Sequence, residues 1–301
     1  MTTADTQSNA AAGADAVAET PSGSRLRRKW GEIPVHISLL ILGLIVSAPV
    51  IVALFWSFTP LKEFQSGSNL FIWPDSWTFA NYRRAWTVTP FGRFVLNSIV
   101  QTGIITIAQV VLSILAGYAF AMFNFKGKNL LFGIVIGSLI IPFELTFIPN
   151  FILISDLGWA NTFKGLTVPF LASAFGVFMF RQFFMTVPRE LYEAAKIDGA
   201  SDWFYLWRIM VPLSKGAVSA FTIFAFLSAW NQYLWPLVIT NEETKRTAQI
   251  GIRFFLVNQE SATDWGAIMA STMIVMVPTL IIFLFAQKQL VKGIAATGLK
   301  G

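Results

Sequence analysis

The sequence predicts an all-α integral membrane protein that crosses the membrane six times. Of its 301 residues 55% are hydrophobic and only 13% are charged, and the mean hydropathy is +0.61, a composition far outside the range of soluble domains. A spanning helix needs about 20 apolar residues. Six stretches approach or exceed that length: 37–58, 95–123, 130–154, 166–184, 217–239 and 265–286. Six spans place both termini on the same side of the membrane.

The first stretch follows an N-terminal tail of different composition. Residues 1–24 consist mainly of Ala, Thr, Ser, Gly and Asp, which bury too little apolar surface to fold, so we expect this segment to be disordered. The basic cluster at 25–29 then leads into a span too long, and too poor in cleavage signals, for a removable signal peptide. The expected domains are therefore a tail at 1–30 and a transmembrane domain at 31–301.

The distribution of basic residues predicts the orientation. With the N-terminus inside the cell, 14 of the 22 Lys and Arg residues lie on the cytoplasmic side, as the positive-inside rule favours. Both termini are then cytoplasmic. The net charge of +6 and the pI near 9.7 follow from this bias, and because these residues flank the spans, we expect no nucleic-acid partner.

The polar segment 186–213, between the fourth and fifth spans, carries the clearest functional signal. Pro188 suits the first position of a helix, where its missing N–H is no loss, and Glu190 and Glu193 suit the positive end of the helix dipole. Gly199 is placed to end this helix in a left-handed conformation. The segment therefore predicts a helix at about 188–198, on the cytoplasmic side.

One face of this helix is small, because Leu191, Ala194, Ala195 and Asp198 recur at helical spacing. Such a face suits close docking into a groove of a partner. A second helix is expected at 203–210, ended by Pro212 before the next span. An amphipathic linker lying on the membrane surface is the alternative, although that would require bulkier apolar side chains.

Two polar sites inside the spans are candidates for a solute pathway. Glu144 lies between two prolines in the third span, and because a carboxylate is costly in the membrane we expect it to point into the bundle. In the fifth span Asn231, Gln232 and Tyr233 precede Pro236, and amides and aromatic faces suit polyhydroxylated solutes. For each of these residues the alternative is a bond that only joins neighbouring helices.

Two long external connections, 59–94 and 241–264, are also expected. The first contains Trp73, Trp77, Tyr82 and Trp86, an aromatic set typical of the membrane interface. These loops either anchor the protein in the headgroup region or form part of a landing surface for an external solute-binding protein. The sequence leaves both interpretations open.

The sequence lacks the residues that several kinds of chemistry require. It has no cysteine and a single histidine, His36, which excludes thiol–metal sites, histidine-based metal sites and a Ser–His triad. The phosphate-binding pattern G-x-x-x-x-G-K-[ST] is also missing, since Gly127-Lys128 has no glycine at the required upstream position. We therefore expect no enzyme and no cofactor on this chain.

Four segments carry a family resemblance: FRQFFMTVPRELYEAAKIDGAS (180–201), VPLSK (211–215), WNQYLWP (230–236) and VKGIAATGLKG (291–301). They resemble the carbohydrate-uptake family of ABC transporter permeases, and the closest likeness is to the second permease subunit of maltose and sn-glycerol 3-phosphate importers. The resemblance covers essentially residues 30–301. It implies a type I ABC importer bundle, in which 186–213 is the EAA loop that couples the permease to an ATPase.

The same resemblance implies the coupling residues and the partners. Glu193, Ala194, Ala195, Asp198, Gly199 and Pro212 match the EAA motif. The partners would be a homologous permease, two ATPase subunits that bind ATP and Mg, and an extracytoplasmic binding protein, in a bacterial or archaeal plasma membrane. In this family the C-terminal tail reaches between the ATPase subunits, so Gly298, Lys300 and Gly301 are candidate contacts, with a disordered tail as the alternative.

The solute and the energy source are less firmly indicated. The motifs favour sn-glycerol 3-phosphate or a related glycerophospho compound, whereas the lack of Lys or Arg near the centre of a span favours a neutral di- or oligosaccharide such as maltose or trehalose. The alternative of another class is an ion-coupled secondary transporter. Such transporters usually carry several ionisable groups within their spans, whereas the expected spans of this chain contain few besides Glu144.

Overall fold

The computed structural model describes residues 23–66, 73–87, 89–257 and 264–298, and this part of the chain is helical, without strands. The chain divides into two compact units, 1–52 and 53–301, which we treat separately. The expected boundary at residue 30 lies inside a helix. The first unit consists, as far as it is described, of most of α1 (Gly23–Ser57).

Helix α1 begins before the basic cluster at 25–29, so these residues are helical rather than part of an irregular tail. Arg, Leu and Lys are good helix formers, which explains the earlier start. The described side chains at 33–50 are exposed, as expected of a helix that meets lipid or a partner chain. The expected disorder of residues 1–22 concerns a segment outside the described residues.

The second unit contains the remaining helices. From residue 61 to 156 they are α2 (Leu61–Gln65), α3 (Ala80–Thr87), α4 (Phe91–Met122), α5 (Lys128–Ser138) and α6 (Phe143–Asp156). Up to the polar segment follow α7 (Phe163–Thr167), the 3-10 turn η1 (Val168–Phe170) and α8 (Ala174–Phe184). The polar segment forms α9 (Arg189–Ile197), α10 (Asp202–Tyr205), the π-helical turn η2 (Leu206–Met210) and α11 (Val211–Leu213). The rest comprises α12 (Lys215–Trp230), α13 (Leu234–Ile239), η3 (Glu243–Lys245), α14 (Ala248–Val257) and α15 (Trp265–Gly298).

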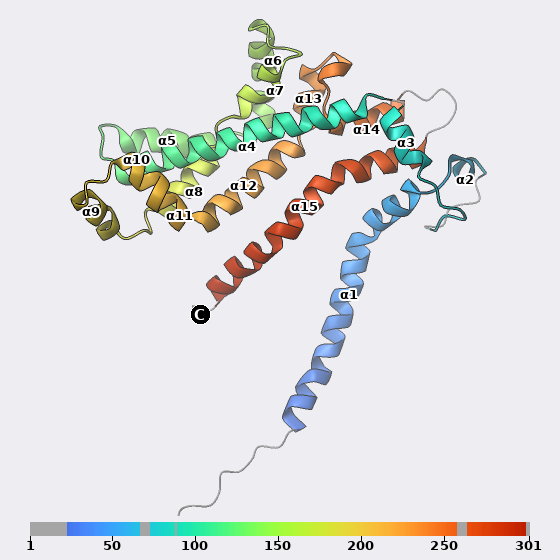
Figure 1. The fold of residues 1–301 in the computed structure, drawn as a ribbon, viewed down its shortest axis with the longest axis horizontal. Coiled ribbons are helices and arrows are strands. Elements are labelled where there is room, and N and C mark those ends of the chain that lie inside the picture. Colours follow the sequence, from blue (N-terminus) through green and yellow to red (C-terminus); the bar gives the residue numbers. More distant parts are fainter. Residues whose placement is uncertain (1–22, 67–72, 88, 258–263, 299–301) are drawn as a thin grey trace, which may run out of the picture. The chain divides into compact units, whose positions relative to one another are not determined.

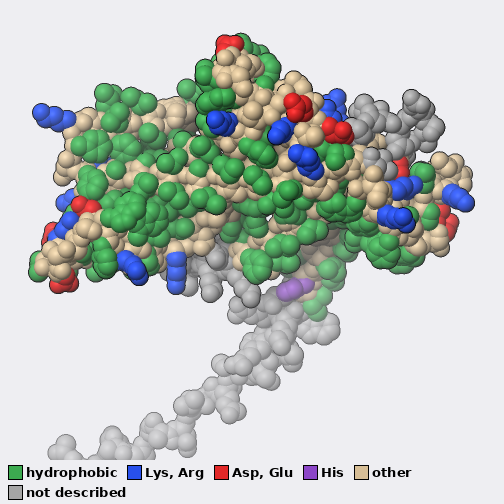
Figure 2. All heavy atoms as spheres, turned by 45° about the horizontal axis from the view of Figure 1, so that its top comes forward, with side chains coloured by type: hydrophobic (Ala, Val, Ile, Leu, Met, Phe, Trp, Pro, Cys, Tyr) green, Lys and Arg blue, Asp and Glu red, His purple; other side chains and the backbone are tan. Residues whose placement is uncertain are grey.

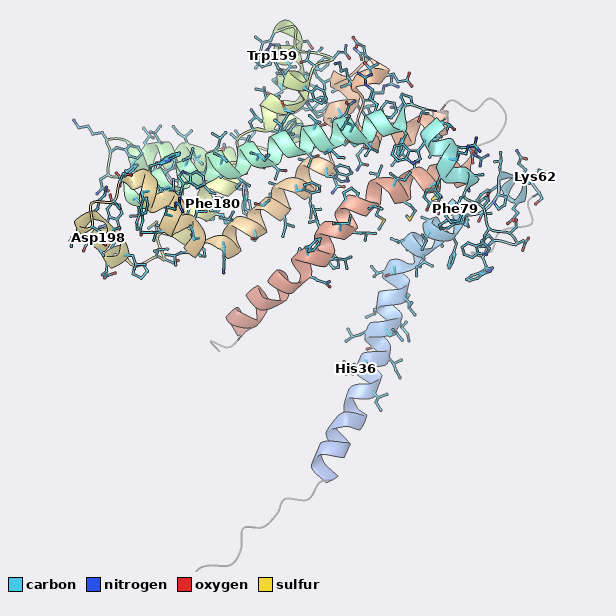
Figure 3. The ribbon with its side chains drawn as sticks, in the orientation of Figure 1. His36, Lys62, Phe79, Trp159, Phe180 and Asp198 are labelled. Carbon is cyan, nitrogen blue, oxygen red and sulfur yellow. The ribbon has the colours of Figure 1, made fainter. Side chains whose placement is uncertain are left out.

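Helices α4, α8 and α12 form the main packed layer (Figure 1). Gly117 of α4 lies so close to α8 that an added Cβ would be 2.7 Å from the Cβ of Phe180, and Gly176 lies similarly close to Phe221 of α12. Small residues at helix crossings allow such close approach in membrane proteins. Figure 3 shows the buried Phe180 within this layer. The same core continues to Ala195 and Tyr205, which ties α9 and α10 to the ends of α4 and α8.

Two smaller cores lie at other parts of the unit. One joins α3, the start of α4, α14 and the start of α15 around Phe91, Phe94 and Phe255. The other joins α6, α7 and α13, where the indole of Trp235 donates a hydrogen bond to the Gly165 carbonyl at 2.9 Å. These cores attach the short helices α3, α7, α13 and α14 to longer ones.

Six spans are counted when bent helix pairs are included. Three helical segments are long and apolar enough to cross a membrane alone: Ile33–Ser57, Phe91–Met122 and Trp265–Gln287. Three pairs pass the same test but are bent, by 98° between α5 and α6, by 42° between Phe163–Phe170 and α8, and by 82° between Asp202–Leu213 and α12. The expectation of a six-span helical protein is confirmed, although the third to fifth spans are not straight helices.

The breaks have local causes. Pro142 precedes α6 in an extended conformation, and a proline disfavours helical geometry in the residue before it. In the fifth span the interruption falls at 231–233, whereas Pro236 lies within the first turn of α13, where a missing N–H is tolerated. The span expected at 217–239 is therefore interrupted earlier than its proline indicates.

Hydrophobic side chains cover much of the visible face of the second unit, and charged side chains lie mainly towards its margins (Figure 2). Large apolar side chains of α4, α5, α6 and α15 are exposed. A surface of this kind belongs in lipid or against another membrane subunit.

Candidate functional site

Helix α9 carries most of the predicted coupling residues. Pro188 stands just before the helix in an extended conformation, so it precedes the first turn rather than occupying it, and Glu190 lies in that turn. At the other end Gly199 has a φ of +79°, as its position predicts. The Gly199 and Ala200 amides donate to the carbonyls of Lys196 and Ala195 at 3.0 and 2.9 Å. These two bonds form a Schellman motif, which satisfies the carbonyls at the helix end.

The side of α9 that packs against the protein differs from our expectation. Ala195 is only 7% exposed and belongs to the core that includes Tyr118, Phe184 and Tyr205, so it cannot face a partner. Helical spacing groups residues on one face but does not say which face turns inward. The small side chain of Ala195 is needed for packing within this chain, and the predicted docking face is wrong in this respect.

The exposed face of α9 contains the other predicted residues. Glu193, Ala194 and Asp198 are exposed, and Ile197 beside them is 87% exposed, an unusually high exposure for an isoleucine on a polar helix. Asp198 lies at the outer end of this face (Figure 3). An exposed isoleucine among carboxylates and a small alanine forms a compact surface suited to a partner groove.

A cluster of polar side chains fixes α9 against α10. The Tyr192 hydroxyl donates a hydrogen bond to Asp202 at 2.7 Å, and Lys196 forms an ion pair with the same carboxylate at 2.9 Å. The hydrogen bond from Tyr192, followed by Lys196, holds the pKa of the Asp202 carboxyl below its ordinary value. The same hydrogen bond raises the pKa of Tyr192. Ser201 caps α10 by accepting from the Phe204 amide at 3.2 Å, so the connection between the helices has a defined geometry.

Pro212 does not end the second helix of the segment. The helical path continues from Asp202 to Leu213 and bends by 82° only after it, at Ser214. Ahead of Pro212 the Val211 amide bonds to the Leu206 carbonyl, five residues back, which forms a π-helical turn. Because Pro212 cannot donate to the Arg208 carbonyl and its ring would crowd that carbonyl, the wider turn accommodates the proline without a break.

The amide of Gln232 takes part in a contact between two spans. Its Oε1 accepts a hydrogen bond of 2.8 Å from Nε2 of Gln101, which is only 2% exposed on α4. The neighbouring Asn231 caps α12 and donates to the Leu227 carbonyl at 2.9 Å, while Tyr233 is exposed beyond it. The break at 231–233 thus presents polar groups between α12 and α13, and the predicted pathway residues Gln232 and Tyr233 stay candidates.

Glu144 occupies a different position from the one expected. It is exposed in the first turn of α6, directly after Pro142, so it does not point into the interior of this chain. There the positive end of the helix dipole stabilises its carboxylate. Because α5 and α6 meet at a sharp bend, the residue lies beside that bend rather than in the middle of a straight span.

Sequence reasoning missed the polar face of α4. Asn97, Ser98 and Gln101 stand at positions i, i+1 and i+4 of an apolar helix, and this helical spacing alone could have identified them. All three are buried. Asn97 donates to the carbonyls of Thr244 and Arg246 at 3.0 and 2.8 Å, whereas Gln101 faces Gln232. Partners this distant in sequence become visible only in the folded chain.

The C-terminal candidates are only partly described. Helix α15 continues through Gly293 to Gly298, so the glycines do not interrupt it there. A single glycine costs about 1 kcal/mol in a helix and is tolerated within a long one. Lys300 and Gly301 lie outside the described residues. Over the described part of the chain, no group of three or more His, Asp or Glu side chains is placed to hold a metal ion.

The bent spans, the α9–α11 segment and the polar contacts between spans are features of a membrane transport subunit. The fold matches a bacterial ABC transporter involved in the import of the acidic polysaccharide alginate, with a TM-score of 0.79 and 24% identity over 89% of this chain and 99% of that chain. A second structure, a bacterial alginate ABC transporter in complex with an alginate pentasaccharide-bound periplasmic protein, aligns with a TM-score of 0.51 and 17% identity over 88% of this chain and 95% of that one.

Residues 109–296 match the family described as binding-protein-dependent transport system inner membrane component, and this chain belongs to that family. Among its relatives is the sn-glycerol-3-phosphate transport system permease protein UgpE of Yersinia pestis bv. Antiqua (strain Antiqua). It is 36% identical over 274 residues, which are 89% of this chain and 97% of the relative. The chain is therefore a multi-pass membrane permease of a carbohydrate-type ABC importer, as its motifs predicted.

Proposed function

We propose that this chain is one of two permease subunits in an importer for sn-glycerol 3-phosphate or a related glycerophospho compound. The observation that carries this solute assignment is the 36% identity to a permease named for sn-glycerol 3-phosphate, which extends over nearly the whole of both chains. A similarity of that extent includes the spans as well as the coupling segment.

ATP is hydrolysed on separate subunits in this proposal. The sequence lacks the phosphate-binding loop that an ATPase needs, and the exposed face of α9, with Glu193 and Ile197, offers a docking surface. Two ATPase subunits would bind ATP and Mg and receive α9 from each permease. The core that joins Ala195 to Tyr118 and Phe184 would then pass the motion of α9 directly to α4 and α8.

The remaining partners follow from the family description and from the charge distribution. The family is described as binding-protein-dependent, which supports an extracytoplasmic binding protein that delivers the solute. A second, homologous permease would cover part of the exposed apolar surface. The excess of Lys and Arg on the side of 186–213 supports cytoplasmic termini in a bacterial or archaeal plasma membrane.

Transport then proceeds by alternating access, in which ATP closes the ATPase pair and opens the bundle outward, and hydrolysis resets it.

The break at 231–233 is the proposed place of contact with the solute. The amides of Gln101 and Gln232 and the ring of Tyr233 lie where α12 is interrupted, and such groups bind hydroxyl-rich solutes. The same neutral groups suit a di- or oligosaccharide such as maltose or trehalose, which is the alternative solute. The proposal of an ion-coupled transporter loses support, because Glu144 is exposed beside a bend rather than enclosed in the bundle.

The solute assignment is tested by uptake into proteoliposomes that contain the complete importer and its binding protein. We expect labelled sn-glycerol 3-phosphate to accumulate and an excess of unlabelled compound, but not of maltose or trehalose, to compete. Gln232→Ala should lower the transport rate without changing the affinity of the isolated binding protein. The matched control is Gln249→Ala, an amide of α14 that bonds instead to the Trp230 carbonyl. Competition by maltose or trehalose alone would reverse the solute assignment.

A further inference from the structure

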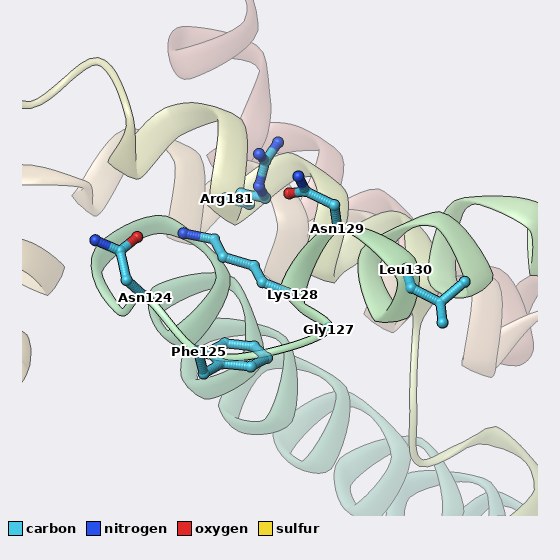
Figure 4. Close-up of a pocket in the computed structure, with 7 residues that line it drawn as sticks. All are labelled: Asn124, Phe125, Gly127, Lys128, Asn129, Leu130 and Arg181. Atoms are coloured by element: carbon cyan, nitrogen blue, oxygen red, sulfur yellow. The ribbon is translucent and has the colours of Figure 1, made fainter.

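A basic pocket lies at the turn between α4 and α5, near the coupling segment but separate from it. It has a volume of about 430 Å³ and is lined by Asn124, Phe125, Gly127, Lys128, Asn129, Leu130 and Arg181. Figure 4 shows that the side chains of Lys128, Asn129 and Arg181 gather on one side of this turn. The lining contains two cations and two amides but no carboxylate, so the pocket has an uncompensated positive charge.

The positive charges around the pocket add up to a strong positive potential. Arg181 lies with its guanidinium 4.0 Å from the centre of the Phe132 ring, and its Nε is buried without a hydrogen-bond partner. The charged neighbours that act on Lys128 are Arg181 and Arg189, both of the same sign. Lys128 itself donates to the Phe123 carbonyl at 2.8 Å, a bond that uses one of its three protons. The remaining Lys128 protons can bind a ligand.

The backbone adds to this positive character. Helix α5 begins at Lys128, and its N-cap is Gly127, which has a φ of +81° and provides no side chain to cap the first amides. The amide of Lys128 bonds to the Phe125 carbonyl at 3.3 Å, whereas the amides of Asn129 and Leu130 point, with the positive end of the helix dipole, towards the start of the helix, where the lining residues lie. A helix start of this kind binds phosphate readily when cations stand beside it.

The apolar surroundings distinguish between possible sources of a phosphate. Leu130, at the edge of the pocket, is 70% exposed, and Ile134 follows it one turn later on the same helix and is also exposed. An apolar strip that leads away from a cationic pocket matches a lipid, whose phosphate binds the cations while its acyl chains follow the helix. Free phosphate would not contact this apolar strip.

We propose that this pocket binds the phosphate group of an anionic membrane phospholipid, with the side chains of Lys128 and Arg181 and the backbone amides of Asn129 and Leu130 as its donors. The pocket volume suits a phosphate with part of its glycerol. A lipid held there would join the α4–α5 turn to the end of α8, and α8 leads directly into α9. The lipid would therefore stabilise the base of the coupling segment.

The test measures thermal unfolding of the complete importer in detergent as lipid is added. Phosphatidylglycerol should raise the Tm of the wild type, whereas neutral phosphatidylcholine and inorganic phosphate at equal concentration should have little effect. Lys128→Gln should require about tenfold more phosphatidylglycerol for the same shift, since a charge-assisted hydrogen bond contributes roughly that factor. Arg181→Gln should act similarly. Lys128→Arg should retain the wild-type response.

Lys126→Gln is the matched control, because Lys126 lies in the same turn with the same charge but does not line the pocket. Its response to phosphatidylglycerol should equal that of the wild type. The proposal is wrong if Lys126→Gln and Lys128→Gln respond alike, or if phosphatidylcholine stabilises the importer as well as phosphatidylglycerol. An equal shift with inorganic phosphate alone would assign the pocket to a soluble anion and would likewise overturn the lipid proposal. Because Lys128→Gln changes a partly exposed residue, the test does not depend on Arg181→Gln folding.

Discussion

At the scale of single residues, the coupling segment depends on a few positions with strict requirements. Gly199 adopts a left-handed conformation, Ala195 fills a core position and Asp202 accepts bonds from two side chains. Each requirement belongs to the folding of this chain rather than to contact with a partner. Substitutions there should change the stability of the segment itself.

Replacing Gly199 tests backbone strain alone, without steric crowding. No atom lies within 4 Å of an added Cβ, so the cost of a side chain arises from its φ of +79° alone. We expect Gly199→Val to destabilise the segment by about 1–2 kcal/mol and Gly199→Asn, a residue that tolerates this conformation, by clearly less. Limited proteolysis of residues 186–201 in the assembled importer measures this difference. Equal protection of the two variants would contradict the strain argument.

The Asp202 cluster predicts a pH dependence. Because the folded pKa of this carboxyl is lowered, its stabilising contribution is present above the unfolded pKa, near 3.8, and is lost as pH falls through the folded pKa. The side chain is 41% exposed, so the contribution should stay below about 1 kcal/mol. Hydrogen exchange of α9 amides, corrected for intrinsic rate, should show Asp202→Asn less protected than wild type at pH 7, and the difference should shrink as pH falls below the unfolded pKa. A difference that stays constant over that fall in pH would exclude this linkage.

At the scale of helices, close packing and polar ties position the spans. Helices α4 and α8 approach closely at Gly117, while Arg84 of α3 joins Asn81 to Asp264 at the start of α15. Asn81 in turn donates to the carbonyls of Ser57 and Thr59 at 2.9 and 2.7 Å. The connection at 59–94 is thereby attached to the last span.

Gly117→Ala tests the contact between α4 and α8. The new Cβ would lie 2.7 Å from the Phe180 Cβ and 3.0 Å from the Arg181 backbone nitrogen, so the helices must shift. We expect a loss of about 1–3 kcal/mol in stability, as overpacked cores show. Gly103→Ala, on the same helix with no atom within 4 Å, should be neutral or stabilising. Thermal unfolding of both variants in detergent measures the difference, and equal Tm values would contradict the packing.

Arg84→Gln tests the tie between α3 and α15. Asp264 is nearly buried and would lose its ion pair, which measures 3.3 Å. The expected loss is about 1–3 kcal/mol, the usual contribution of a hydrogen bond to a charged group, because Asp264 would keep its bond from the Ala267 amide at 3.0 Å. The neighbouring Arg83 is exposed, so Arg83→Gln should have little effect. If chemical denaturation gives the same midpoint for both variants, the ion pair between Arg84 and Asp264 does not contribute to stability.

At the scale of the whole molecule, hydropathy predicts the number of spans and their approximate positions, because the membrane imposes a simple length requirement. Local chemistry also predicts the left-handed Gly199. The bends are less visible: Pro142 marks one, but Pro236 does not coincide with the interruption at 231–233. Whether a helix face turns inward depends on packing between distant segments. Periodicity alone therefore led to the wrong prediction that Ala195 lies on the docking face of α9.

The same limit applies to the polar residues within the spans. The cost of a charge in a membrane indicates that Glu144 needs a polar environment, but not that a bend brings it to the first turn of α6. Gln101 is unremarkable as a single residue of α4, and its relation to Gln232 arises from the packing of α4 against α12. Short sequence motifs therefore identified the transport family, whereas contacts between spans required the fold.

The most direct test of the coupling proposal is solute-stimulated ATP hydrolysis and solute uptake by the reconstituted importer, with ATP on the side that carries α9. We predict uptake that requires ATP and the binding protein and that persists when ion gradients are collapsed. Ile197→Asp, on the exposed face of α9, should reduce both activities at least tenfold while the permease pair still assembles, and Ile197→Leu should retain them. Uptake driven by an ion gradient without ATP, or full coupling in Ile197→Asp, would contradict the account.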